Sequence, residues 1–137
     1  DIIVRNPYST RPYQHVLECL SGYLLLAQLQ YEDKSLASSY NFGPDDNSCV
    51  TTGSLSDLFC DAWGDGIKWK NVSEANAPHE ASFLKLDCAK AKKELGWKPY
   101  WSIKKAVEKT VEWEKAVLNG TSPAEITDRQ IREYFKI

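Results

Sequence analysis

The stretch Leu86-Asp87-Cys88-Ala89-Lys90-Ala91, continued by Leu95-Gly96-Trp97-Lys98-Pro99, holds a whole short helix with its start and stop signals. Asp87 is a good N-cap because its carboxylate can accept a hydrogen bond from a backbone N–H of the first turn. Glycine readily adopts the left-handed conformation that ends a helix, and the proline prevents the helix from resuming. We therefore predict a helix over 88–95, with Trp97 packed back against it.

Two more helices are predicted after this segment. Ser102 is placed to cap an amphipathic helix that ends near Asn119-Gly120. Ser122-Pro123-Ala124-Glu125 combines an N-cap, a proline at the first helical position and a capping-box glutamate. The last helix is expected to run to about Phe135.

Strands and helices alternate before residue 86. Short strands are predicted at 1–5, 38–42, 67–71 and 82–86, with the last two forming a small sheet. Ser54 and Asp57 resemble a capping box that opens a helix, which Gly64 and Gly66 end. The predicted fold class is mixed α/β, mostly helical with short strands.

A longer helix is predicted over 15–31, and its apolar residues recur with helical spacing. They are Val16, Leu20, Tyr23, Leu24, Ala27 and Tyr31. Such a stripe predicts a deeply buried helix.

Composition excludes several classes of protein. The 137 residues suit one domain or part of a larger one, and a net charge of −2 does not indicate a nucleic-acid partner. No apolar run approaches the length of a membrane helix, so no membrane partner is expected. The four cysteines form no CxxC pair, which favours reduced thiols and a cytoplasmic protein.

Familiar catalytic motifs are missing from the sequence. There is no GxGxxG segment, in which glycines let the backbone approach a dinucleotide pyrophosphate, and no Walker loop, GxSxG or HExxH. The two histidines lack metal-type spacing, and Asp45-Asp46-Asn47 does not follow the calcium-loop pattern. No catalytic, cofactor-binding or metal residue is assigned.

Four side chains are candidates from their type and position. Arg11 lies in a loop before the long helix, where a guanidinium can grip a phosphate; an exposed surface arginine is the alternative. His15 suits acid–base work or, more simply, a helix start. His79 and Glu80 lie in a polar loop that can reach a ligand or remain solvated.

Three segments together resemble the extended short-chain dehydrogenase/reductase family, which includes sugar-nucleotide epimerases and dehydratases. The first is 86–99 with its Leu-Gly-Trp-x-Pro stop. The second is Arg11-Pro12-Tyr13-Gln14-His15-Val16-Leu17-Glu18, in which proline stands where the family usually has aspartate. The third is Tyr40-Asn41-Phe42-Gly43.

The resemblance implies a Rossmann-type fold, NAD as cofactor of the intact enzyme and a nucleotide-sugar substrate. It implies that Arg11 contacts the nucleotide diphosphate, and that Asn41, His79 and Glu80 are substrate-side contacts. Within the family, the sugar-nucleotide 4,6-dehydratases resemble the chain most. These lyases of deoxysugar biosynthesis oxidise the sugar at C4 with bound NAD, eliminate water across C5 and C6, and return the hydride to C6.

The resemblance also implies that the catalytic parts of the family lie upstream of the matched region. Residues 1–137 are then the C-terminal, nucleotide-sugar-binding portion, which the absence of methionine agrees with. Elements at about 13–43 are expected to pack on the missing N-terminal NAD-binding domain. We expect the chain alone to be inactive and to self-associate, rearrange or stay bound to that domain, and the intact enzyme to be a homo-oligomer.

Two other functions remain open at this point. One is a stand-alone module that binds a nucleotide sugar without chemistry or binds another protein. The other is that the chain is part of a different sugar-nucleotide dehydratase or epimerase.

Overall fold

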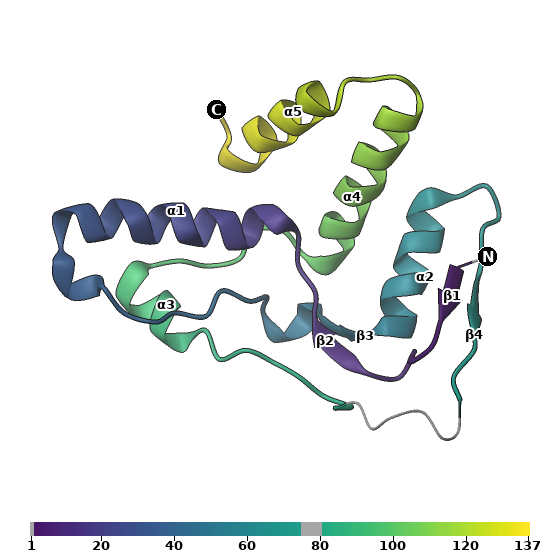
Figure 1. Ribbon diagram of the computed structural model, residues 1–137, viewed down its shortest axis with the longest axis horizontal. Helices are drawn as coiled ribbons and strands as arrows, with labels where there is room; N and C mark the ends of the chain where they lie inside the picture. The colour runs from purple at the N-terminus through teal and green to yellow at the C-terminus, as the bar shows by residue number, and fades with distance from the viewer. Residues whose placement is uncertain (1, 75–80) are drawn as a thin grey trace.

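A computed structural model describes residues 2–74 and 81–137 of the chain (Figure 1). Its elements are β1 (Ile2–Val4), β2 (Thr10–Pro12), α1 (Val16–Glu32), β3 (Cys49–Thr51), α2 (Thr52–Trp63), β4 (Trp69–Asn71), α3 (Ala89–Leu95), α4 (Ile103–Leu118) and α5 (Pro123–Phe135), with 3₁₀ turns at Lys34–Leu36 and Asp46–Ser48. The fold is mixed α/β, mostly helical with short strands, which confirms the predicted class.

The strands form two separate pairs. β1 lies parallel to β4, with Ile2 opposite Trp69, and β2 lies antiparallel to β3, with Arg11 opposite Val50. Each strand has three residues, so the tertiary contacts around it and not its own ladder hold it in place. β2 was not anticipated from sequence.

Two strand predictions are wrong. Residues 38–42 form no strand, and residues 82–86 do not pair with 67–71. Instead, Phe83 makes an isolated parallel bridge to Thr10. The alternation of residue types was there, but alternation does not specify a partner strand.

Helix ends follow the capping rules in part. α3 starts one residue later than predicted, with Cys88 and not Asp87 as its N-cap, although Asp87 Oδ1 accepts from the Ala89 N–H at 2.8 Å. Gly96 ends α3 in the left-handed conformation at φ 66°. Ser122 is the N-cap of α5, but its side chain makes no capping hydrogen bond. Ser102 caps α4 as predicted. α2 starts earlier than expected, because Thr51 and not Ser54 supplies the capping oxygen.

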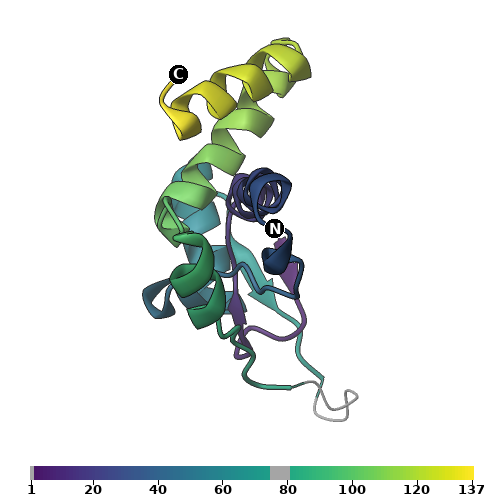
Figure 2. The same cartoon turned by 90° about the vertical axis from the view of Figure 1, so that its left-hand side faces the viewer.

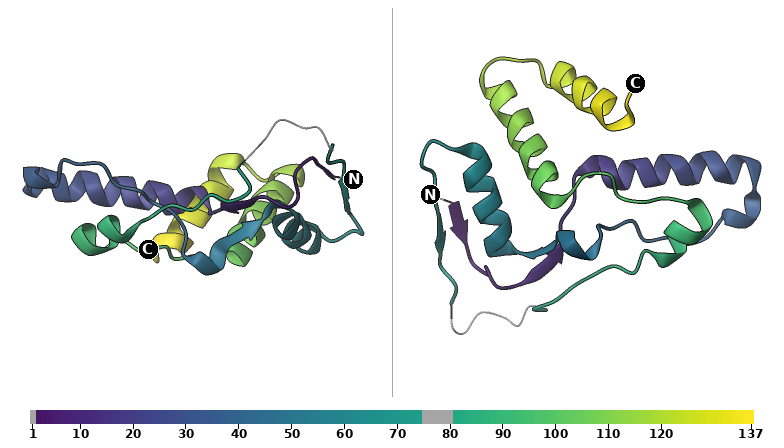
Figure 3. Two further views of the ribbon diagram at one scale, coloured as in Figure 1. Left: turned by 90° about the horizontal axis from the view of Figure 1, so that it is seen from below. Right: turned by 180° about the vertical axis from the view of Figure 1, so that it is seen from behind.

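The core has two parts that lie at opposite ends of the flat molecule seen in Figure 3. One joins α1 to α3 around Phe42, Leu95 and Trp97. The other joins α2 to α4, with Ile103, Val107 and Val111 buried. α5 continues from α4 and folds back above α1, as Figures 1 and 2 show.

The apolar face of α1 is not buried, contrary to the prediction from its periodicity. Val16 is 62% exposed, Leu24 63% and Tyr31 92%. Contacts to α3 come from the other side of the helix, through Leu25, Leu26 and Leu29. We call the exposed face the α1 stripe; it comprises Val16, Leu20, Tyr23, Leu24, Ala27 and Tyr31.

None of the helices within 2–74 and 81–137 has both the length and the apolar character needed to cross a membrane.

Candidate functional site

Arg11 lines a hollow of about 490 Å³ between β1, β2 and the start of α2. We call it the arginine hollow. Its polar residues are Arg5, Asn6, Ser9, Arg11, Tyr13, Thr52 and Ser56, and its remaining lining is Ile2, Ile3 and Val4. Two guanidinium groups and no carboxylate among these residues make the hollow suitable for an anion.

The Arg11 side chain is held against its own strand. Its Nη1 atom donates to the carbonyl of Thr10 at 3.0 Å, and the residue is half-buried. β2 is in turn fixed by β3, since Arg11 stands opposite Val50. The predicted phosphate-binding residue therefore comes from a paired strand and not from a mobile loop.

Hydroxyl groups tie the floor of the arginine hollow to α2. Thr52 Oγ1 lies 2.8 Å from the Tyr13 hydroxyl and 3.2 Å from Ser9 Oγ. The Thr52 N–H also donates to the Ser9 carbonyl at 3.0 Å. Because Ser9 and Tyr13 flank Arg11, these bonds position the strand that carries the guanidinium.

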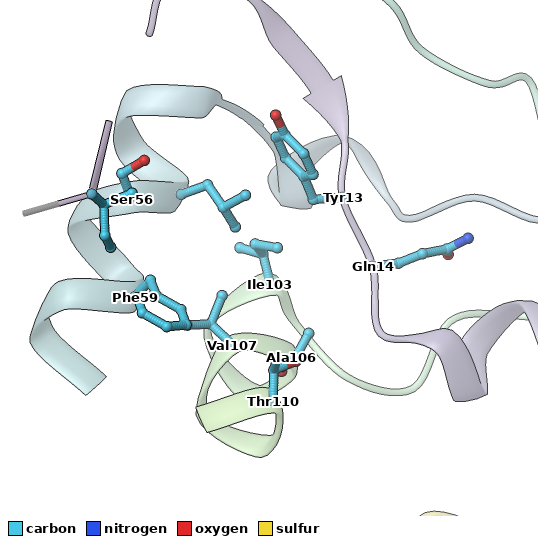
Figure 4. Close-up of a pocket in the computed structure, with 10 residues that line it drawn as sticks. Tyr13, Gln14, Ser56, Phe59, Ile103, Ala106, Val107 and Thr110 are labelled. Atoms are coloured by element: carbon cyan, nitrogen blue, oxygen red, sulfur yellow. The ribbon is translucent and has the colours of Figure 1, made fainter. Parts of the chain in front are cut away.

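A second, apolar cavity of about 490 Å³ adjoins the hollow and shares Ile2, Tyr13 and Ser56 with it. Figure 4 shows Phe59 of α2 and Ile103 and Val107 of α4 on one side of this cavity, with Tyr13 on the other. Such a lining can accept apolar groups but provides no chemistry of its own.

Gln14 lies at the junction of the apolar cavity and α1. Its amide nitrogen donates to the Phe42 carbonyl at 2.8 Å, while its Oε1 atom is buried without a hydrogen-bond partner in the described part of the chain. Phe42 is thereby held to the segment that carries Arg11. Sequence reasoning did not single out Gln14.

His15 is the N-cap of α1, and its Nδ1 atom accepts from the Leu17 N–H at 3.3 Å. Its ring also meets Trp101 edge-on, with centroids 4.9 Å apart. Burial, and then the positive charge of Lys109, lower the pKa of His15 below its ordinary value. The simpler of its two interpretations, a histidine at a helix start, is the one the structure shows.

Of the other predicted substrate contacts, Asn41 does not line the arginine hollow. Asn41 is exposed, and its Nδ2 atom donates to the Asp87 carbonyl at 3.1 Å. It therefore links the segment before Phe42 to the start of α3. His79 and Glu80 lie outside the described residues.

Two further residues with clear roles in the structure were not singled out from sequence. Arg5 directly follows β1 and lines the hollow, but a lone arginine beside a turn carried no pattern to mark it. Glu18 is fully buried and accepts the backbone N–H groups of Tyr100 and Trp101 at 2.9 and 2.7 Å. The signal for Glu18 was that it is the only charged residue between Val16 and Tyr31.

No family model matches the chain. Its sequence is 43% identical over 135 residues to the CDP-glucose 4,6-dehydratase of Salmonella typhimurium, an alignment that covers 98% of this chain. This chain is homologous to part of a CDP-glucose 4,6-dehydratase. The chain spans 37% of the length of that dehydratase. The predicted resemblance to sugar-nucleotide dehydratases is confirmed.

Solved structures of sugar-nucleotide epimerases share the fold. A UDP-glucose 4-epimerase from Stenotrophomonas maltophila, with bound NAD and formylated UDP-arabinopyranose, matches 88% of this chain and 37% of its own at a TM-score of 0.72 and 19% identity. The UDP-glucose 4-epimerase of Bifidobacterium longum, in complex with NAD⁺ and UDP, matches 86% and 36% at a TM-score of 0.67 and 20% identity. These matches support the Rossmann-type family fold that was expected.

Proposed function

We propose that this chain is the substrate-binding part of an NAD-dependent CDP-glucose 4,6-dehydratase, a lyase that forms CDP-4-keto-6-deoxy-D-glucose for deoxysugar biosynthesis. The observation that carries the proposal is the 43% identity to the Salmonella CDP-glucose 4,6-dehydratase along nearly the whole chain. The arginine hollow supports it, because a cationic hollow is what a nucleoside diphosphate needs.

Substrate binding and catalysis would be carried by different parts of the enzyme. Arg11 would bind the diphosphate of CDP-glucose and hold the sugar in register with the catalytic groups. NAD, which takes the hydride from C4 and returns it at C6, would be held by a domain outside residues 1–137. No residue of this chain is assigned to proton transfer or to cofactor contact.

The α1 stripe supports a neighbouring domain. Leu20, Tyr23 and Leu24 are 43, 55 and 63% exposed on one face of a helix whose other face packs on α3. A continuous apolar face of this kind is normally covered in the working protein. We propose that elements at about 13–43 pack on the NAD-binding domain, and that the chain alone is inactive.

The compartment proposed is the cytoplasm. All four cysteines are free, and burial raises the pKa of the Cys19 and Cys88 thiols, which makes them poor nucleophiles. Unpaired cysteines are typical of a reducing compartment.

The test is complementation with a partner domain. The part of the Salmonella dehydratase that the alignment leaves uncovered is joined to the N-terminus of this chain, and formation of the 4-keto sugar from CDP-glucose is measured. We expect turnover from the chimera and none from either part alone. A chimera that binds NAD and folds but never dehydrates CDP-glucose contradicts the proposal.

Arg11 gives the residue-level test in the same chimera. Arg11→Ala should raise KM for CDP-glucose by roughly tenfold, since it removes a charge-assisted contact to phosphate. Arg129→Ala is the matched control, because Arg129 is an exposed arginine that pairs with Glu112 on the distant α4–α5 face. Tight binding of CDP by this chain alone, measured by calorimetry, would favour a stand-alone binding module.

A further inference from the structure

Arg5 shares the arginine hollow with Arg11, although the two come from different strand pairs. Arg5 follows β1, whose partner is β4, whereas Arg11 lies in β2, whose partner is β3. Each strand is held by its own partner, so the fold brings the two arginines to the lining of one hollow. A pair of cations presented in this way fits a ligand with two adjacent anionic centres better than one with a single centre.

The Arg5 side chain is available for such a ligand. The residue is exposed, and within residues 2–74 and 81–137 no hydrogen bond or ion pair engages its guanidinium. None of the described residues that line the hollow is a carboxylate, so a bound anion would gain electrostatic free energy from the Arg5 guanidinium. Lys92 provides the contrast, because its ammonium is already paired with Asp45 at 2.5 Å.

The hydroxyl groups that line the hollow are engaged in hydrogen bonds within the protein. Thr52 Oγ1 is engaged by both Tyr13 and Ser9, and Ser56 Oγ donates to the Thr52 carbonyl at 2.8 Å. These hydroxyl groups therefore hold the wall of the hollow together, and the two arginines are the charged residues in its described lining. Recognition in the hollow should depend on anionic charge and not on a hydroxyl pattern.

We infer that Arg5 is a second diphosphate-binding residue, so that Arg5 and Arg11 together select a nucleoside diphosphate over a nucleoside monophosphate. The inference rests on the proposed function, which places the diphosphate of the substrate at Arg11. It adds that each phosphate carries its own guanidinium contact, and that Arg5 is a specificity-determining residue.

The experiment compares CDP with CMP as competitive inhibitors of the chimera described above. With the unchanged sequence, CDP should bind at least about tenfold more tightly than CMP, because only CDP reaches both arginines. Arg5→Ala should weaken CDP by roughly tenfold and leave CMP nearly unchanged, which removes most of the preference. Arg5→Lys keeps the charge but loses the bidentate geometry of the guanidinium. Its preference for CDP over CMP should lie between those of the unchanged sequence and Arg5→Ala.

A purely structural role for Arg5 would weaken both nucleotides equally, and that result overturns the inference. So does an unchanged CDP/CMP ratio in Arg5→Ala. Lys104→Ala is the control, since Lys104 is an exposed cation on α4 that does not line the hollow.

Failure of the proposed function can be distinguished from failure of the Arg5 inference. If the chimera shows no dehydration, binding of CDP and CMP to the 137-residue chain is followed by NMR titration at millimolar nucleotide. Loss of CDP preference in Arg5→Ala then supports the two-arginine site while the dehydratase proposal fails. An unchanged preference in this titration overturns the inference.

Discussion

The Glu18 carboxylate accepts a hydrogen bond from the Tyr134 hydroxyl at 2.8 Å, which joins the first turn of α1 to the last turn of α5. The same carboxylate accepts the N–H groups of Tyr100 and Trp101. Burial raises the pKa of Tyr134, and the bond to Glu18 raises it further. One buried side chain thus connects α1, the segment before α4 and α5.

Replacing Glu18 should destabilise the chain strongly. Glu18→Ala leaves two partly buried backbone N–H groups and a buried phenol without their acceptor, and each lost bond to a charged group costs on the order of 1.5–3 kcal/mol. We expect the free energy of unfolding to fall by about 3 kcal/mol or more, measured by urea denaturation. Glu32→Ala, at the exposed C-terminal end of the same helix, should change it by less than about 0.5 kcal/mol. Equal effects of the two would contradict this role.

Gly22 should not tolerate even a methyl group. A Cβ atom there would lie 2.4 Å from Cδ1 of Phe42, whose ring is also held edge-on by Trp97. Alanine gains about 1 kcal/mol in helix propensity, but overpacking a fixed ring costs typically 1–3 kcal/mol. Gly22→Ala should therefore lower the midpoint of thermal unfolding.

The control for Gly22 is Gln28→Ala on the exposed part of α1, which should leave the midpoint unchanged or raise it slightly. A stabilised Gly22→Ala variant would show that Phe42 can move aside.

Sequence reasoning was accurate where a local rule decides the outcome. The end of α3 at Gly96 and the start of α4 at Ser102 follow from sequence, since a cap needs only the residues of its own turn. Predictions from sequence were wrong where the structure of a segment depends on a partner far away in the chain. Residues 38–42 stay unpaired and Phe83 meets Thr10, because pairing depends on segments far apart in the chain.

The candidate site shows the same limit. Arg11 was identified through its place in a family-like segment, but Arg5 joins it only because β1 and β2 come together beside α2. The periodicity of α1 located an apolar face, but the prediction that this face is deeply buried was wrong for this chain, because periodicity does not identify a covering partner. Glu18 gained its role from Tyr134, 116 positions away.

Stability should fall as the pH drops below the ordinary pKa of histidine. The folded chain lowers the pKa of His15, so between about 6.5 and that lowered value the unfolded chain binds the proton more readily. The neutral ring is also required to accept the Leu17 N–H. The contribution is present above pH 6.5 and is lost as the pH falls through the folded pKa.

The measurement is the free energy of unfolding in urea between about pH 5 and 7.5. It is made in a His79→Gln background, so that His15 is the sole histidine. His15→Gln should flatten the slope in this range relative to that background. Identical slopes with and without His15 would contradict the assignment.

The α1 stripe should make the 137-residue chain associate with itself. Burying apolar surface gains roughly 25 cal/mol per Å², so a few hundred Å² of exposed face is worth several kcal/mol when two copies meet. Leu24, which is 63% exposed, is the best single position to test. Leu24→Lys should reduce the binding of an apolar dye and shift sedimentation towards the monomer, because a charge in the interface must be desolvated. Glu32→Gln makes the same change in net charge outside the stripe, and it should change neither the dye binding nor the sedimentation. If the unchanged chain is already monomeric and binds no dye, the α1 stripe does not drive association, and its exposure does not require a covering domain.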